Sequence, residues 1–126
     1  MERKFLALGA SLGLIGVMAG AFGAHLLKKH LEADLLIVFE TGVRYQMYHA
    51  FAILISAVVM KLYPGKWAVR AVWLFLAGII VFSGSLYTLS LTGVRGIGGF
   101  TPFGGLAFLA GWFCLIMHAY DKRKQG

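Results

Sequence analysis

The sequence predicts an all-α membrane protein: four transmembrane helices in an antiparallel bundle, with both termini in the cytoplasm. Composition is the first reason, because 60% of the 126 residues are hydrophobic, 13% are charged and the mean hydropathy is +0.79. Water-soluble domains carry about a quarter charged residues, which excludes a soluble enzyme and a free nucleic-acid-binding domain. The second reason is that four apolar stretches approach the roughly 20 residues that a helix needs to cross a membrane. We expect a single domain over residues 1–126.

The four expected spans cover residues 5–27, 45–62, 67–91 and 103–120. A β-barrel, the other spanning structure, needs alternating polar and apolar residues, and residues 76–82 show no such alternation. A cleaved signal peptide is the alternative for residues 1–24. Its apolar run of about 20 residues exceeds the usual 7–15, so we expect a retained first helix.

The first span is rich in glycine. Gly9, Gly13, Gly16, Gly20 and Gly23 recur at spacings of three and four, which places them on one face of a helix. In lipid, helices associate through close backbone contact at small residues. We therefore expect this face to pack against another helix, and the alternative is that it lines a ligand site.

A polar segment, residues 40–49, leads into the second span and overlaps its start. It reads Glu-Thr-Gly-Val-Arg-Tyr-Gln-Met-Tyr-His. On a helix, Glu40 and Arg44 are four residues apart and can form an ion pair. Tyr45 and His49 lie on a second face and Gln46 on a third. Because ionisable groups near a membrane are costly, these residues are either a brace at the outer headgroup level or the lining of a functional cavity. The candidate polar cluster is His25, Glu40, Arg44, Tyr45, Gln46 and His49.

Two connectors separate the second, third and fourth spans. The short turn Tyr63-Pro64-Gly65-Lys66 predicts an antiparallel hairpin of the second and third spans. Residues 92–102 are glycine-rich and end in Thr101-Pro102, a capping residue followed by proline at the first helical position. The fourth helix is therefore expected to start near Pro102.

The basic residues predict the orientation, because Lys and Arg accumulate on the cytoplasmic side of membrane proteins. Alternating spans place eight of the twelve at the end that holds the termini and four at the other end. The eight are Arg3, Lys4, Lys61, Lys66, Arg70, Lys122, Arg123 and Lys124, and the four are Lys28, Lys29, Arg44 and Arg95. Both termini are therefore expected in the cytoplasm.

No metal or other cofactor is expected. A zinc site needs several converging ligands, and no His-x-x-His or Glu-x-x-His pair occurs. A haem between His49 and His118 is disfavoured because these residues are expected at opposite ends, with His49 just inside the outer end of its helix. The basic tail at 122–124 can hold anionic lipid, so nucleic acid is not needed as a partner. The expected partners are membrane lipids, a second copy of the chain or another membrane protein.

Four motifs resemble those of a known family. They are Gly-Ala-Phe-Gly-Ala-His at 20–25, Phe-Glu-Thr-Gly-Val-Arg-Tyr-Gln-Met-Tyr-His at 39–49, Phe-Ser-Gly-Ser-Leu-Tyr at 82–87 and Thr-Pro-Phe-Gly-Gly at 101–105. Together they resemble the domain-of-unknown-function 423 family of small bacterial inner-membrane proteins, to which eukaryotic transmembrane protein 256 is similar. The resemblance implies four helices and a location in the cell membrane, and it implies no reaction.

Three hypotheses of function follow. The first is a non-enzymatic membrane protein that binds lipid, serves as an accessory subunit or self-associates, because no catalytic set is recognisable. The second is a small transporter or a proton or ion pathway that uses Glu40, Arg44 and His49, since transporters place such groups at membrane depth. A membrane enzyme with His49 or Glu40 as its acid or base is a third hypothesis.

Overall fold

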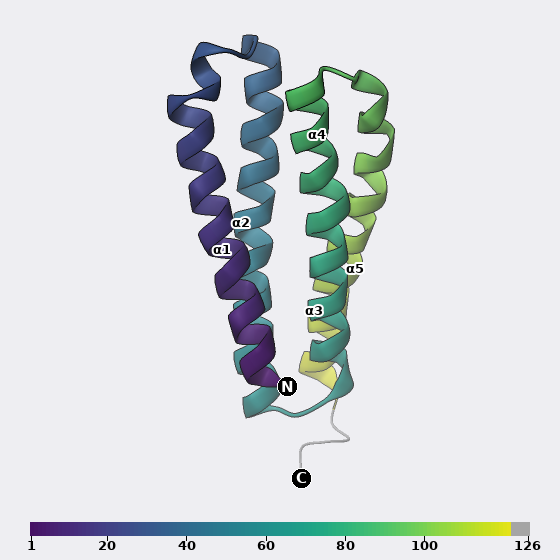
Figure 1. Ribbon diagram of the computed structural model, residues 1–126. Coiled ribbons are helices and arrows are strands. Elements are labelled where there is room, and N and C mark those ends of the chain that lie inside the picture. The colour runs from purple at the N-terminus through teal and green to yellow at the C-terminus, as the bar shows by residue number, and fades with distance from the viewer. Residues whose placement is uncertain (122–126) are drawn as a thin grey trace.

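Four long helical rods stand side by side in the computed structural model, which describes residues 1–121 (Figure 1). The first rod contains α1 (Glu2–His25) and the short η1 (Leu27–Lys29), and the second is α2 (Ala33–Leu62). The third rod runs through α3 (Lys66–Gly78), the π-helical η2 (Ile79–Ser83) and α4 (Gly84–Thr92), and the fourth through η3 (Arg95–Phe100) and α5 (Thr101–Tyr120). Each rod is long and apolar enough to cross a membrane, which confirms the all-α class with four spans.

α1 begins and α5 ends at the same end of the bundle (Figure 1). We call this the terminal end, and the opposite end the far end. An antiparallel order of four spans requires this arrangement, and the assignment of the terminal end to the cytoplasm stays a prediction. The basic tail Lys122, Arg123 and Lys124 lies outside the described residues.

α2 begins at Ala33, well before the expected span at residue 45. Its first turns are amphipathic, with Phe39 buried and Glu40 exposed. A helix continues wherever its own hydrogen bonds are made, so the length of the apolar stretch underestimates the length of the helix. As a consequence, Gln46 and His49 lie near the middle of a 30-residue helix. The expected position of His49 near the outer end of its helix is therefore wrong.

The start of α5 also differs in detail from the prediction. Thr101 is the first residue of the helix, and Phe100 is the residue before it. The Thr101 hydroxyl forms a hydrogen bond with the Ser85 hydroxyl of α4 at 2.6 Å and does not cap the helix. Pro102 lies in the first turn as expected.

α1 packs mainly against α2, and three of its glycines form the contact. Gly9, Gly16 and Gly23 are buried and recur every seven residues. An added Cβ would lie 2.9 Å from the Leu54 side chain at Gly9 and 3.0 Å from the Phe39 ring at Gly23. A seven-residue period is typical of a seam between helices that cross at a small angle. These three glycines therefore lie at the contact between α1 and α2.

The other two glycines of the expected face contribute less. An added Cβ at Gly20 would lie at ordinary contact distance, 3.4 Å, from Val43. At Gly13 it would meet nothing within 4 Å, so the expected packing role of Gly13 is wrong. Both residues fall beside the seven-residue seam, where the surfaces of two cylindrical helices have already curved apart.

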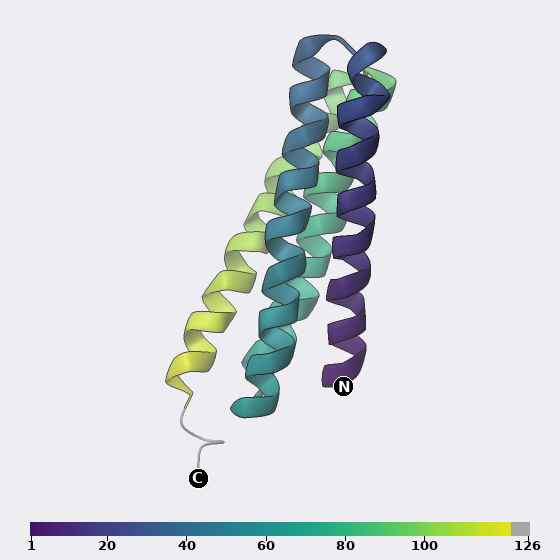
Figure 2. The same cartoon turned by 90° about the vertical axis from the view of Figure 1, so that its left-hand side faces the viewer.

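α5 packs against the third rod and lies away from α2. Gly104 lies directly against the backbone of Phe82, and Gly78 directly against the ring of Phe108. Figure 2 shows α2 between α1 and α5, with α5 leaning away from α2 toward the terminal end. α2 and α5 are therefore neighbours without a close backbone seam.

Candidate functional site

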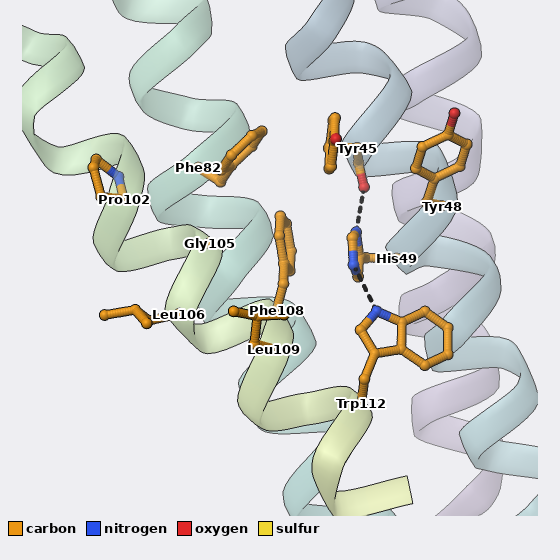
Figure 3. A pocket seen from close by; sticks show the side chains of 10 residues that line it. All are labelled: Tyr45, Tyr48, His49, Phe82, Pro102, Gly105, Leu106, Phe108, Leu109 and Trp112. Atoms are coloured by element: carbon orange, nitrogen blue, oxygen red, sulfur yellow. Dashed lines mark hydrogen bonds between the residues drawn. The ribbon is translucent and has the colours of Figure 1, made fainter. Parts of the chain in front are cut away.

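His49 lies at the centre of the bundle, buried between α2 and α5. Its Nδ1 is 2.7 Å from the Tyr45 carbonyl oxygen, and its Nε2 is 3.1 Å from Trp112 Nε1 (Figure 3). A carbonyl only accepts and an indole N–H only donates, so Nδ1 carries the proton and Nε2 accepts. The ring of Phe108 stacks on the imidazole at 3.5 Å between centroids, with 5° between planes. His49 is thus a neutral imidazole with a fixed tautomer and both nitrogens engaged.

A cavity of about 700 Å³ lies beside this histidine, between α2 and α5 with η2 behind it (Figure 3). Most of its wall is aromatic or aliphatic. Leu106 and Leu109 on its rim are 62% and 67% exposed, so the cavity opens onto the outer surface of the bundle. Its lining residues are Tyr45, Tyr48, His49, Phe82, Pro102, Gly105, Leu106, Phe108, Leu109 and Trp112.

Two residues of this wall, Tyr45 and Tyr48, carry a phenol group. Among residues 1–121, the hydroxyls of Tyr45 and Tyr48 have no hydrogen-bond partner, although both rings make aromatic contacts. The polar nitrogens of His49 and Trp112 are already paired with each other. The surface that the cavity offers is therefore almost entirely apolar.

A second cavity, of about 530 Å³, continues between the same helices toward the terminal end. It is lined by Ile55, Val59, Tyr63, Leu115, His118 and Ala119. We call the two cavities together the α2/α5 groove.

His118 closes the groove at the terminal end. Its Nε2 donates to the Tyr63 carbonyl oxygen at 2.6 Å, and its Nδ1 accepts the backbone N–H of Ala68 at 3.2 Å. Ala68 lies in the first turn of α3, where backbone N–H groups have no partner within the helix. An added Cβ at Gly65 would lie 2.9 Å from His118 Cε1, so this turn needs a glycine. Sequence reasoning placed His118 near this end but assigned it no site, because its partners are backbone groups far away in the chain.

Gln46 joins three rods. Its Nε2 donates to the Leu12 carbonyl oxygen of α1 at 2.8 Å, and its Oε1 accepts from the Tyr87 hydroxyl of α4 at 2.6 Å. The side chain is 3% exposed. Gln46 therefore acts as a brace at the level where α1 and α4 both face α2.

The π-helical segment η2 adds a further bond at this level. The hydroxyl of Ser83, its last residue, donates to the Gly42 carbonyl oxygen at 2.7 Å. π-turns occur mostly as single interruptions of α-helices and often lie at functional sites. No residue pattern in the sequence predicts this turn.

The expected polar cluster separates into two sets. Gln46 and His49 are buried, and Tyr45 is half-buried on the wall of the groove. Glu40, Arg44 and His25 are exposed.

The expected ion pair between Glu40 and Arg44 does not form within residues 1–121, where Glu2 pairs with the terminal amino group and Asp34 with Arg95. An exposed pair of this kind gains little, about 0–1 kcal/mol. At the far end the pair that forms is Asp34 with Arg95, at 2.7 Å, and it joins the start of α2 to η3.

The buried polar groups form closed contacts within residues 1–121. Every buried side-chain nitrogen or oxygen there has a hydrogen-bond partner. That part of the chain also brings together no group of three or more His, Cys, Asp or Glu residues that could hold a metal ion. What the arrangement offers a ligand is the apolar α2/α5 groove and not a polar cavity.

Comparison with known proteins places this fold among bacterial membrane proteins. A family model described as "Protein of unknown function (DUF423)" matches residues 19–105. The chain is 42% identical over 121 residues to the UPF0382 membrane protein SH2409 of Staphylococcus haemolyticus, with 94% of this chain and 96% of the relative covered. For the UPF0382 membrane protein YwdK of Bacillus subtilis the identity is 43% over 118 residues, covering 93% and 96%. For the UPF0382 inner membrane protein YgdD of Escherichia coli it is 38% over 127 residues, covering 100% and 97%. No solved structure matches the chain.

Proposed function

This chain belongs to the DUF423 family of multi-pass membrane proteins, and from that premise we propose that it is a non-enzymatic protein that binds a membrane lipid in the α2/α5 groove. The observation that carries this proposal is the groove itself, with cavities of about 700 and 530 Å³ along two spanning helices. Ligand pockets in proteins typically measure about 300–1,000 Å³. A groove on the lipid-facing surface is filled in the membrane, and its wall selects what fills it.

The wall favours a hydrocarbon chain. Burying a polar group without a hydrogen bond costs roughly 1–3 kcal/mol in proteins, and His49 and Trp112 have no group left to bond one. The exposed rim residues Leu106 and Leu109 allow entry from the side.

Closed hydrogen bonding supports the non-enzymatic part of the proposal. His49 cannot exchange a proton without breaking a bond to Tyr45 or Trp112. For the alternative, a proton or ion pathway, the groups put forward are Glu40, Arg44 and His49. Glu40 and Arg44 are exposed while His49 is buried, so these three do not line one path.

A photo-crosslinking experiment tests the groove. The purified protein in nanodiscs is labelled with a phospholipid that carries a diazirine in its acyl chain, and labelled peptides are mapped by mass spectrometry. We expect labelling concentrated on residues 102–112. The substitution Gly105→Leu fills the groove, because an added Cβ there meets nothing within 4 Å, and we expect it to reduce labelling of 106–112 at least fivefold.

Gly13→Leu is the matched control, since Gly13 also has open space but lies on α1. It should leave the labelling of 106–112 unchanged. Uniform labelling of all exposed helix faces, or no effect of Gly105→Leu, would contradict lipid binding in the groove. A dimer in native mass spectrometry that crosslinks through the groove would assign the site to a second copy. A proton or ion flux in proteoliposomes that His49→Phe abolishes would support the pathway instead.

A further inference from the structure

A separate cavity of about 410 Å³ lies at the terminal end, between the start of α1 and the end of α2. It is lined by Glu2, Arg3, Leu6, Ala57, Val58, Lys61 and Leu62. None of these residues lines the α2/α5 groove. The cavity therefore belongs to a different face of α2.

Basic side chains outnumber acidic ones in the lining of this cavity. Arg3 and Lys61 are exposed, one on each helix, and within residues 1–121 neither forms an ion pair. The Glu2 carboxylate pairs with the amino group of Met1 at 3.5 Å. Two basic side chains thus stand on opposite helices over one cavity, which also holds the Glu2 carboxylate, and Glu2 interacts electrostatically with Lys61 as well as with the terminal amino group.

The remaining wall is aliphatic and faces outward. Leu6, Val58 and Leu62 are all exposed large hydrophobic residues. Leu6 and Val58 lie on the side of the cavity that runs along the helices toward the membrane interior, whereas Arg3, Lys61 and Leu62 lie in the first and last turns. The cavity therefore has a charged part at the helix ends and an apolar part beneath it.

We propose that this cavity binds an anionic phospholipid, with Arg3 and Lys61 on the phosphate and an acyl chain along Leu6 and Val58. A guanidinium matches the paired oxygens of a phosphate, and a lysine ammonium reaches a headgroup while its stem stays on apolar surface. Helix ends lie at the headgroup level of a bilayer, so the phosphate and the two cations meet at one depth. The proposal does not depend on the α2/α5 groove.

The test measures the affinity of the intact protein for phosphatidylglycerol by native mass spectrometry, with phosphatidylcholine as the uncharged comparison. We expect the double variant Arg3→Gln, Lys61→Gln to lose about tenfold in affinity for phosphatidylglycerol and to retain its binding of phosphatidylcholine. The double variant Arg3→Lys, Lys61→Arg keeps the charge and should retain most of the affinity. Both changes are at exposed positions, and thermal unfolding in detergent checks that the fold is intact.

Lys28→Gln with Lys29→Gln is the matched control, because it removes two exposed charges at the far end. An equal loss in this control would show general charge attraction and overturn the site. An unchanged affinity in the Arg3, Lys61 variant would also overturn it. Complete displacement of the lipid by inorganic phosphate would show a site for free phosphate and not for a lipid. Diazirine labelling of 106–112, which reports on the α2/α5 groove, should be the same in all four proteins.

Discussion

Trp112 and His49 connect α5 to α2 across the groove, with the indole Nε1–H donating to the imidazole Nε2 at 3.1 Å. The other imidazole nitrogen donates to the Tyr45 carbonyl at 2.7 Å, so the ring has no hydrogen-bonding group left for a ligand. These two contacts make a polar residue at the centre of the bundle part of an apolar wall. The groove therefore keeps a surface suited to hydrocarbon even beside His49.

The substitution Trp112→Phe should lower the free energy of unfolding by about 1–3 kcal/mol, because it leaves the buried Nε2 of His49 without a donor. The aromatic contact with Phe75, at 5.0 Å between centroids, would be largely kept. Unfolding in mixed detergent micelles measures the change. Trp73→Phe is the control, since Trp73 is 56% exposed and makes an edge contact with Phe5. Equal losses in the two variants would mean that the bond to His49 contributes nothing.

Gly16→Leu should destabilise the fold by about 1–3 kcal/mol through overpacking. The reason is that a Cβ at Gly16 would lie directly against the sulfur of Met47 on α2. Gly13→Leu, the same change on the same helix, meets open space and should stay within about 0.5 kcal/mol of the parent protein. Thermal unfolding in detergent compares the two. A Gly13 variant as unstable as the Gly16 variant would contradict the seven-residue seam.

The brace at Gln46 can be measured with a double-mutant cycle of Gln46→Leu and Tyr87→Phe. The two side chains share the 2.6 Å bond from the Tyr87 hydroxyl to Oε1. Hydrogen bonds between membrane helices contribute about 0.6 kcal/mol on average, up to roughly 1.7, and we expect a coupling energy in this range. Additive losses, with a coupling near zero, would show that this bond does not link α4 to α2.

The spans could be predicted from the sequence because apolar length is a local property of the chain. The polar pairs could not, since Trp112 lies 63 residues from His49 and Tyr87 lies 41 residues from Gln46. Such pairs depend on the rotation and height of each helix, which are set by packing. The position of His49 at mid-helix was missed for a related reason, because α2 extends well beyond its apolar part.

The spacing of the buried glycines is a signal of this packing that the sequence itself carries. Gly9, Gly16 and Gly23 recur every seven residues, and this period distinguishes the contact seam from Gly13 and Gly20. The spacing of four predicts a wider packing face, because Gly-x-x-x-Gly is the familiar pattern of close helix pairs. The π-turn at η2 had no comparable signal in the sequence. Its contacts, from Ser83 to Gly42 of α2 and from Phe82 to Gly104 of α5, join residues that lie far apart in the chain.

His118→Leu should open the hairpin between α2 and α3. The Ala68 N–H loses its acceptor and the Tyr63 carbonyl loses its donor, and unpaired groups of this kind cost about 1–3 kcal/mol each. We expect hydrogen exchange of the Ala68 amide to accelerate at least tenfold, because in the parent protein that amide is held by the ring and not by its own helix. Exchange of amides in the middle of α5 should change much less.

His25→Leu is the control for this experiment, because it makes the same change at an exposed histidine at the far end. We expect it to leave the hydrogen exchange of the Ala68 amide unchanged. The free energy of unfolding should stay within about 0.5 kcal/mol of that of the parent protein. If exchange at Ala68 stayed slow in the His118 variant, the amide would have another acceptor and the ring would not close the groove. Slow exchange combined with normal stability would therefore reduce His118 to a space-filling residue beside Gly65.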